Sequence, residues 1–100
     1  MTNNNPSKKD NYRIILRWDD VPAHLGQKAA TEIEQGFSRR TWHHNVVCKW
    51  NGNNNTIIIE AENDFDKQGL ALMDEFSDEI SACVKDAGDG GIQVVSVTKV

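Results

Sequence analysis

The neighbouring residues His43 and His44 are the clearest candidates for chemistry in this chain. They lie in a run of alternating apolar and polar residues, which is typical of a strand, so their side chains point to opposite faces and cannot bind one metal ion together. Regular alternation places His43 opposite or diagonal to Glu60 of the following strand. A histidine beside a carboxylate can transfer a proton, or it can form a cross-strand pair that only stabilises the sheet.

No other group of residues supports a catalytic or metal site. Cys48 shares the face of His44, but four residues along a strand separate them by about 13 Å, which is too far for one metal ion. Cys48 and Cys83 lack the spacing of a metal motif, and free thiols are favoured over a disulfide. We therefore expect no cofactor and no metal. The sequence leans against an enzyme and leaves His43 and Glu60 as the alternative, a proton-transfer pair.

The elements that must position these residues follow from the period of the apolar residues, which changes repeatedly between two and 3.6. Read along the chain, the order is β-α-β-β-α-β. Right-handed crossovers then give an antiparallel sheet in the order 4-1-3-2 with two helices on one face. This is an α+β fold, the ferredoxin-like sandwich, over residues 11–100, preceded by a flexible tail at 1–10. The periodic runs cover 12–18, 23–40, 42–50, 53–61, 64–85 and 92–100.

The turn at Asn51-Gly52 sets which face of the hairpin is buried. A two-residue turn and a four-residue loop over 51–54 shift the pairing by an even number, so both bury the same face. Which face of the last strand is buried stays open, because its valines occupy both alternating sets of positions. We expect Asp20 to cap the first helix and the second helix to begin at Asn63 or Asp64, with Phe65 on its buried side. The expected core face of the hairpin is Trp42, His44, Val46, Cys48, Ile57, Ile59 and Ala61.

The opposite face of the sheet, which the helices leave uncovered, is the predicted binding surface. It carries branched apolar residues, with Ile15 and Ile58 as near neighbours, among charged residues that can fix register and specificity. Two-fold dimers are the commonest oligomers, so a homodimer is the first expectation. A solvated face with scattered apolar groups is the alternative. The candidate binding residues are Arg13, Ile15, Arg17, Val47, Lys49, Ile58 and Glu60.

Charge and hydropathy narrow the possible partners. A net charge of -4 disfavours nucleic acid, and the third strand, 56–60, has no aromatic residue for stacking bases. The absence of a long apolar run predicts no membrane span and a cytoplasmic protein. We expect a small binding or regulatory module. The second helix offers a further alternative, an adaptor or inhibitor whose acidic face docks on a basic protein, although a solvated helix face explains the same residues. These are Asp74, Glu75, Asp78 and Glu79.

Overall fold

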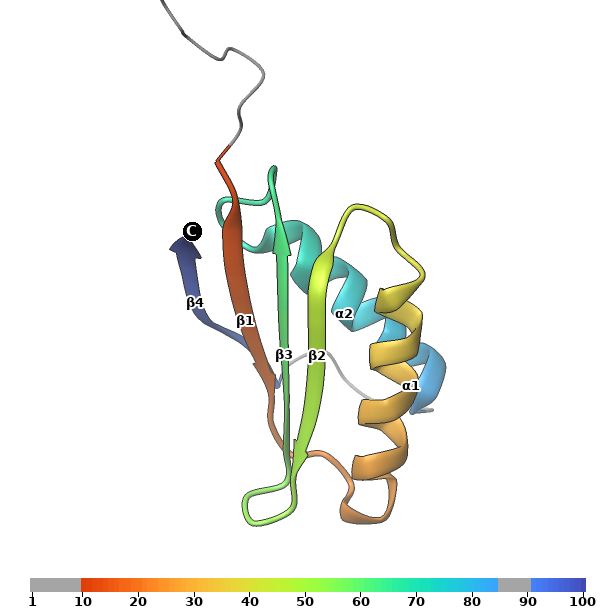
Figure 1. Ribbon diagram of the computed structural model, residues 1–100. Coiled ribbons are helices and arrows are strands. Elements are labelled where there is room, and N and C mark those ends of the chain that lie inside the picture. The colour runs from red at the N-terminus through yellow and green to blue at the C-terminus, as the bar shows by residue number, and fades with distance from the viewer. Residues whose placement is uncertain (1–9, 85–90) are drawn as a thin grey trace, which may run out of the picture.

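The computed structural model describes residues 10–84 and 91–100 and confirms the ferredoxin-like topology. Four strands form one antiparallel sheet in the order β2-β3-β1-β4, and both helices pack on one side of it (Figure 1). Apart from Asp10, the predicted tail lies outside the described residues, as does residue 85 at the predicted end of the second helix. The elements are β1 (Tyr12–Trp18), a 3-10 turn (Ala23–Leu25), α1 (Gly26–Ser38), β2 (His44–Asn51), β3 (Thr56–Asn63), α2 (Leu70–Cys83) and β4 (Ile92–Lys99).

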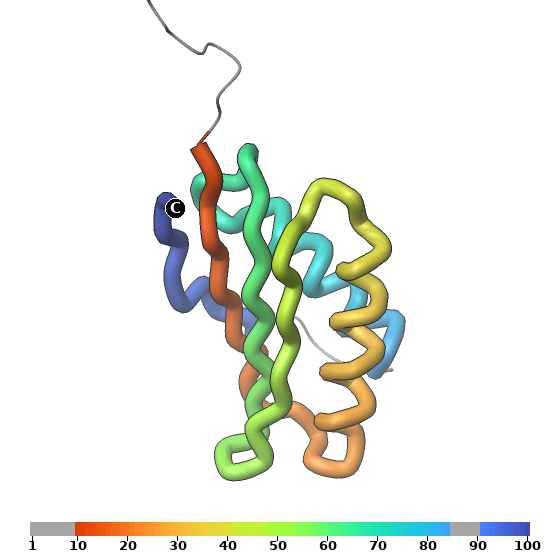
Figure 2. Tube along the Cα trace, in the orientation of Figure 1, coloured from red at the N-terminus to blue at the C-terminus, as the bar shows by residue number. Residues whose placement is uncertain are grey.

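The core lies between the two helices and the two central strands, whose close course is visible in Figure 2. Alternate residues of β1 and β3 face it, as the sequence predicts. Burial of each large apolar side chain contributes about 1.5–3 kcal/mol relative to exposure, so this layer dominates the stability. Its fully buried members include Ile14, Leu16, Ile33, Phe37, Ile57, Ile59, Leu72 and Phe76.

The hairpin between β2 and β3 keeps the predicted parity, and its four-residue loop lies one position later than the four-residue alternative. Asn51 pairs with Thr56 and Cys48 with Ile59, so the loop spans 52–55. This register differs by an even number of residues from that of a two-residue turn at Asn51-Gly52 and from that of a loop over 51–54. Cys48 therefore faces the core as expected, and Val47 and Lys49 lie on the uncovered face.

The start of β2 does not follow the predicted alternation. His44 lies opposite Glu62 whereas Val47 lies opposite Glu60, so β2 holds one extra residue between these pairs. Asn45 adopts a left-handed conformation with φ of 52°, which suits asparagine and lets the strand bulge. The bulge exchanges the two faces: His43 is buried and His44 is exposed. Placing His44 and Trp42 in the core was wrong.

Both helices begin later than the sequence suggests. Asp20 is exposed with φ of 59° and caps no helix; a 3-10 turn precedes α1 instead. The carboxylate of the buried Asp66 accepts hydrogen bonds from the backbone N–H groups of Ala71 and Leu72, at 3.1 and 2.9 Å, and so fixes the start of α2. Phe65 consequently lies in the preceding loop and is exposed, not on the buried side of the helix.

A second bulge explains the undecided parity of β4. The register with β1 changes between Ile15 and Leu16, so Val97 pairs with Ile14 and Val94 with Leu16. Because one extra residue separates them, both valines share the face of their buried partners. No strict alternation in the sequence could have placed both there.

Candidate functional site

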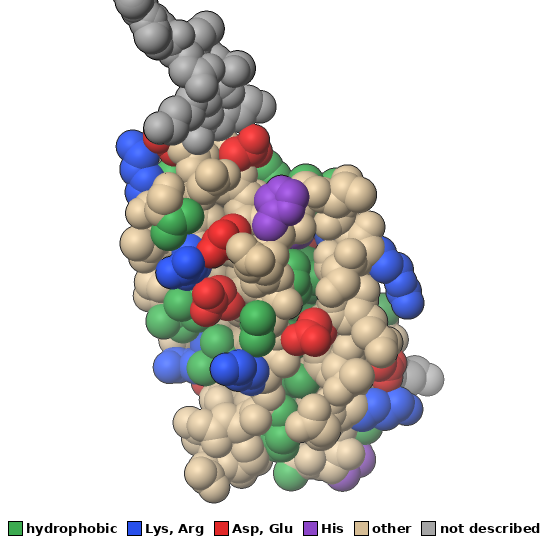
Figure 3. Space-filling view, in the orientation of Figure 1, with side chains coloured by type: hydrophobic (Ala, Val, Ile, Leu, Met, Phe, Trp, Pro, Cys, Tyr) green, Lys and Arg blue, Asp and Glu red, His purple; other side chains and the backbone are tan. Residues whose placement is uncertain are grey.

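The seven predicted binding residues lie together on the uncovered face of the sheet. Hydrophobic, basic and acidic side chains alternate across this face in Figure 3. Paired positions on neighbouring strands form three rows across the sheet, because residues opposite each other share a face. The rows are His44, Glu62, Arg13 and Thr98; then Val47, Glu60, Ile15 and Ser96; then Lys49, Ile58, Arg17 and Gln93.

The apolar part of the face centres on Val47 and Ile58. They are 40% and 37% exposed and lie diagonally across β2 and β3. Together with Lys49 and Glu60 they line a hollow of about 250 Å³ that is open to solvent. Ile15 lies on the next diagonal, so the apolar residues form a zigzag over three strands. We call the four lining residues the sheet hollow.

Most charges on this face are already paired within the chain. Arg13 lies 2.8 Å from Glu62 and 3.3 Å from Glu60. Its hydrogen bond holds the pKa of Glu62 below the usual range of a glutamate. Arg17 lies 3.0 Å from Asp19. Lys49, in contrast, has no ion-pair partner among residues 10–84 and 91–100.

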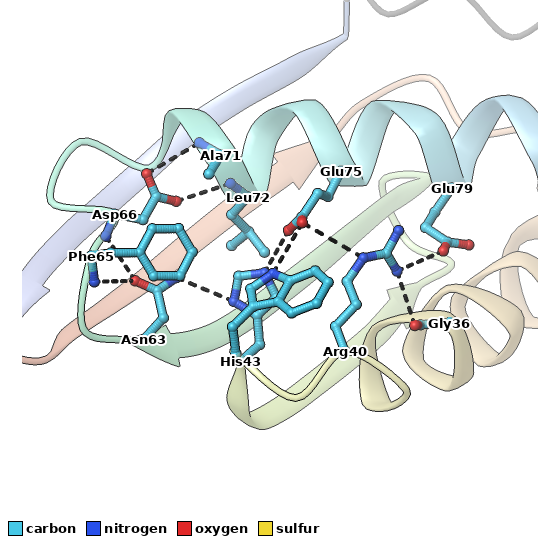
Figure 4. Close-up of polar contacts among 11 residues, drawn as sticks. Gly36, Arg40, His43, Asn63, Phe65, Asp66, Ala71, Leu72, Glu75 and Glu79 are labelled. Atoms are coloured by element: carbon cyan, nitrogen blue, oxygen red, sulfur yellow. Dashed lines mark hydrogen bonds and ion pairs between the residues drawn. The ribbon is translucent and has the colours of Figure 1, made fainter.

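His43 lies on the other side of the sheet and is not paired with Glu60. Its side chain is 0% exposed, and its Nε2 lies 2.6 Å from Oε1 of Glu75 on α2 (Figure 4). Its Nδ1 lies 3.1 Å from Nδ2 of Asn63. The ring also contacts Phe37 and stacks on Phe65. The proposed proton-transfer pair is therefore separated by the sheet.

The hydrogen bonds of Asn63 determine the tautomer of His43. Oδ1 of Asn63 accepts the backbone N–H groups of Phe65 and Asp66, at 3.1 and 2.8 Å, so its Nδ2 must face His43 as a donor. Nδ1 of His43 is then the acceptor, and the ring proton resides on Nε2 and is donated to Glu75. This chain of bonds joins the end of β3, the residue before β2 and the middle of α2.

The surroundings of His43 and the thiols leave little scope for catalysis by them. No substrate atom can reach a fully buried ring, and Glu60 is engaged by Arg13. Both cysteines are free; burial, with the nearby Glu34 carboxylate and Cys83, raises the pKa of the Cys48 thiol to about 12. A protonated thiol is a poor nucleophile. Within the described residues, no cluster of histidine, cysteine or acidic side chains has metal-binding geometry.

Sequence reasoning missed the residues that surround His43. Asn63 accepts hydrogen bonds from backbone N–H groups of the segment that leads into α2, and Asp66 accepts them from the first turn of α2. Asparagine and aspartate commonly make such turns, so this pair was a usable signal for a loop at 63–69. The loop leaves Phe65 at the surface with its ring stacked on His43, and the exposed Trp42 contacts the same histidine.

Comparison of this chain with protein-family models, with curated proteins and with solved structures yields no match. The fold alone does not indicate a function, because the ferredoxin-like sandwich supports many unrelated activities. Among the described helices, none combines the length and apolar character needed to span a membrane.

Proposed function

We propose that this chain is a binding module that forms a homodimer through the uncovered face of its sheet. The observation that carries the proposal is the sheet hollow, in which two exposed apolar residues are flanked by one basic and one acidic residue. A surface that contacts its own copy must be complementary to itself. The arrangement of these four residues meets that condition.

The geometry of the hollow defines a two-fold axis. Val47 and Glu60 are paired across the strands, and so are Lys49 and Ile58. Consider a two-fold axis that lies in the plane of the interface, along the line from Val47 to Ile58. Val47 of one protomer then faces the partner's Val47, and Ile58 faces the partner's Ile58. The same rotation brings Lys49 of one protomer to the partner's Glu60, twice in the dimer.

Strand spacing gives the crossing angle of such a dimer. Neighbouring strands are about 4.8 Å apart and two residues along a strand span about 6.8 Å. The diagonal therefore lies roughly 35° from the strand direction, and the two sheets would cross at roughly 70°. This is close to the orthogonal class of sheet packing, so the contact needs no distortion of either sheet.

The charges of Lys49 and Glu60 also favour contact with a second copy of the chain. Lys49 has no ion-pair partner among the residues that the structure describes, and Glu60 shares Arg13 with Glu62. Each would gain a charge partner in the dimer. Charge pairs of this kind contribute register and specificity more than affinity, while the apolar residues supply the burial.

Charge reversal tests the axis directly. Lys49→Glu alone, or Glu60→Lys alone, sets like charges against each other twice in the homodimer. We expect each variant to dimerise at least about tenfold more weakly than the original chain, as measured by sedimentation equilibrium. Mixing the two variants should restore the dimer, because each introduced charge then meets its opposite at both positions.

Lys28→Glu is the matched control, since it makes the same change of charge on α1, away from the sheet face. It should dimerise as the original chain does. A chain that stays monomeric at every concentration would refute the proposal. So would charge-reversed variants that associate as strongly as the control.

A further inference from the structure

We infer that a second surface, formed by Trp42 and Phe65 beside the outer face of α2, docks a basic segment of another protein. Trp42 is 46% exposed and Phe65 is 49% exposed, although both are large aromatic residues. They flank the buried ring of His43, with centroid distances of 6.1 and 6.2 Å. We call these two residues the aromatic surface. It lies apart from the sheet hollow and does not depend on dimerisation.

The polar cluster drawn in Figure 4 holds the indole of Trp42 and the backbone of Phe65, whose ring stacks on His43. Nε1 of Trp42 donates a hydrogen bond of 3.0 Å to Oε2 of Glu75, which fixes the indole against α2. The backbone N–H of Phe65 donates to Asn63. Exposed aromatic residues that are already ordered lose little conformational freedom on binding. Such residues often supply most of the binding energy at protein interfaces.

The outer face of α2 indicates the charge of the partner. Asp74 and Asp78 are exposed, are one helical turn apart and have no cation partner in the described part of the chain. Such a like-charge pair costs about 0.2–0.5 kcal/mol in an isolated helix, and a bound cation would offset this cost. Leu70, one turn before Asp74, is 57% exposed and adds an apolar contact to the same face.

The two features meet along one helix. Glu75, which holds Trp42, and Asp78 are three residues apart on α2 and are therefore neighbours on the helix surface, so the indole lies at the edge of the acidic face. Glu75 itself is occupied by Trp42, His43 and Arg40 and is not available to a ligand. The two aspartates are available. An ordered aromatic ring beside carboxylates suits an arginine or lysine side chain, which binds both the ring face and the charges.

The occupant is basic and is not a second copy of this chain. A second copy would bring the same acidic helix face and a net charge of -4. A basic segment gains attraction from the aspartates and contact area from Trp42, Phe65 and Leu70. Its affinity must fall as salt rises, because the two carboxylates are exposed.

The probe is a short oligoarginine peptide titrated into the full chain and followed by ¹⁵N NMR. We expect the Nε1–H signal of Trp42 and the amide signals of Phe65 and Asp74 to move, while those of Lys49 and Ile58 do not. Phe65→Ala should weaken binding about tenfold, and Asp74→Asn with Asp78→Asn should weaken it several-fold and reduce its salt dependence. Signals of the core residues Ile14 and Ile59 report whether each variant is folded.

Asp10→Asn with Asp20→Asn is the matched control, because it removes the same charge from exposed residues outside α2. It should bind the peptide as the original chain does. Shifts centred on the sheet face, no shift at low salt, or equal weakening by the two double variants would each overturn the inference. So would movement of the Trp42 signal with protein concentration alone, which would mean that a second copy occupies the surface.

Discussion

Asn63 is the residue on which the buried polar cluster depends. Its side chain is 0% exposed and forms three hydrogen bonds, two with backbone N–H groups and one with His43. A buried donor or acceptor that loses its partner costs about 1–3 kcal/mol. Both parts of the amide group are therefore needed, the oxygen for the loop before α2 and the nitrogen for the imidazole.

We predict that Asn63→Ala lowers the free energy of unfolding by about 2–4 kcal/mol. This range follows from leaving two backbone donors and one ring nitrogen without a partner in a dry site, with partial relief as the loop relaxes. Urea denaturation measures the loss. In the original chain, ¹⁵N NMR of the imidazole should show the proton on Nε2 of His43 and not on Nδ1.

Asn53→Ala is the corresponding control, since Asn53 lies exposed in the loop between β2 and β3. Only a few tenths of a kcal/mol should be lost there. An Asn63 variant that unfolds at the same urea concentration as this control would show that the cluster contributes little. A proton on Nδ1 of His43 would contradict the bonding derived for Asn63.

At the scale of elements, the packing of α1 against β2 requires a glycine at position 26. Gly26 begins α1 with φ of -55°, a conformation open to any residue, yet a Cβ atom there would fall inside the indole of Trp50 on β2. The glycine is needed for close approach and not for its backbone freedom. It lets the first turn of the helix rest directly on the edge strand.

We predict that Gly26→Ala destabilises the fold by about 1–3 kcal/mol, because the indole or the helix must move. Thermal unfolding measures this change. Gly36→Ala is the matched comparison within α1: the atoms nearest to its Cβ belong to the carboxylate end of Glu79, a flexible side chain that can move at the expense of its ion pair with Arg40. It should cost clearly less, and an equal cost for both substitutions would exclude the Trp50 contact as the cause.

The elements also show where the sequence was informative and where it was not. Ile14, Leu16, Ile57 and Ile59 alternate regularly, and every one is buried as expected. The sequence misplaced His43, because one left-handed residue at Asn45 exchanges the faces of everything before it. A local conformation of this kind leaves no trace in hydrophobic alternation, although asparagine makes it possible.

For the molecule as a whole, the order of elements was predictable because the period changes are long and repeated. The sheet face was predictable for the same reason, since Val47, Ile58 and Glu60 lie in regular stretches of strand. The aromatic surface was not, because Trp42 and Phe65 lie in loops that side-chain hydrogen bonds define. Loops fixed by such bonds depend on tertiary partners, which a local pattern does not contain.

At alkaline pH the stability of the whole molecule depends on the buried Cys48 thiol. Burial raises the pKa of the Cys48 thiol to about 12 from its usual value near 9.0, and burial also raises the pKa of Cys83. The folded chain therefore keeps a proton on Cys48 that the unfolded chain loses above about pH 9. The protonated thiol contributes its full stabilisation of the folded state below that pH. The free energy of unfolding then falls as pH rises toward 12, by at most about 1.4 kcal/mol per pH unit. Urea denaturation at about pH 8 and about pH 10 measures how much of the free energy of unfolding is lost between the two. The loss should be smaller for Cys48→Ser, which removes this thiol, than for Cys83→Ser, which keeps it. Equal losses in the two variants would mean that Cys48 is solvated.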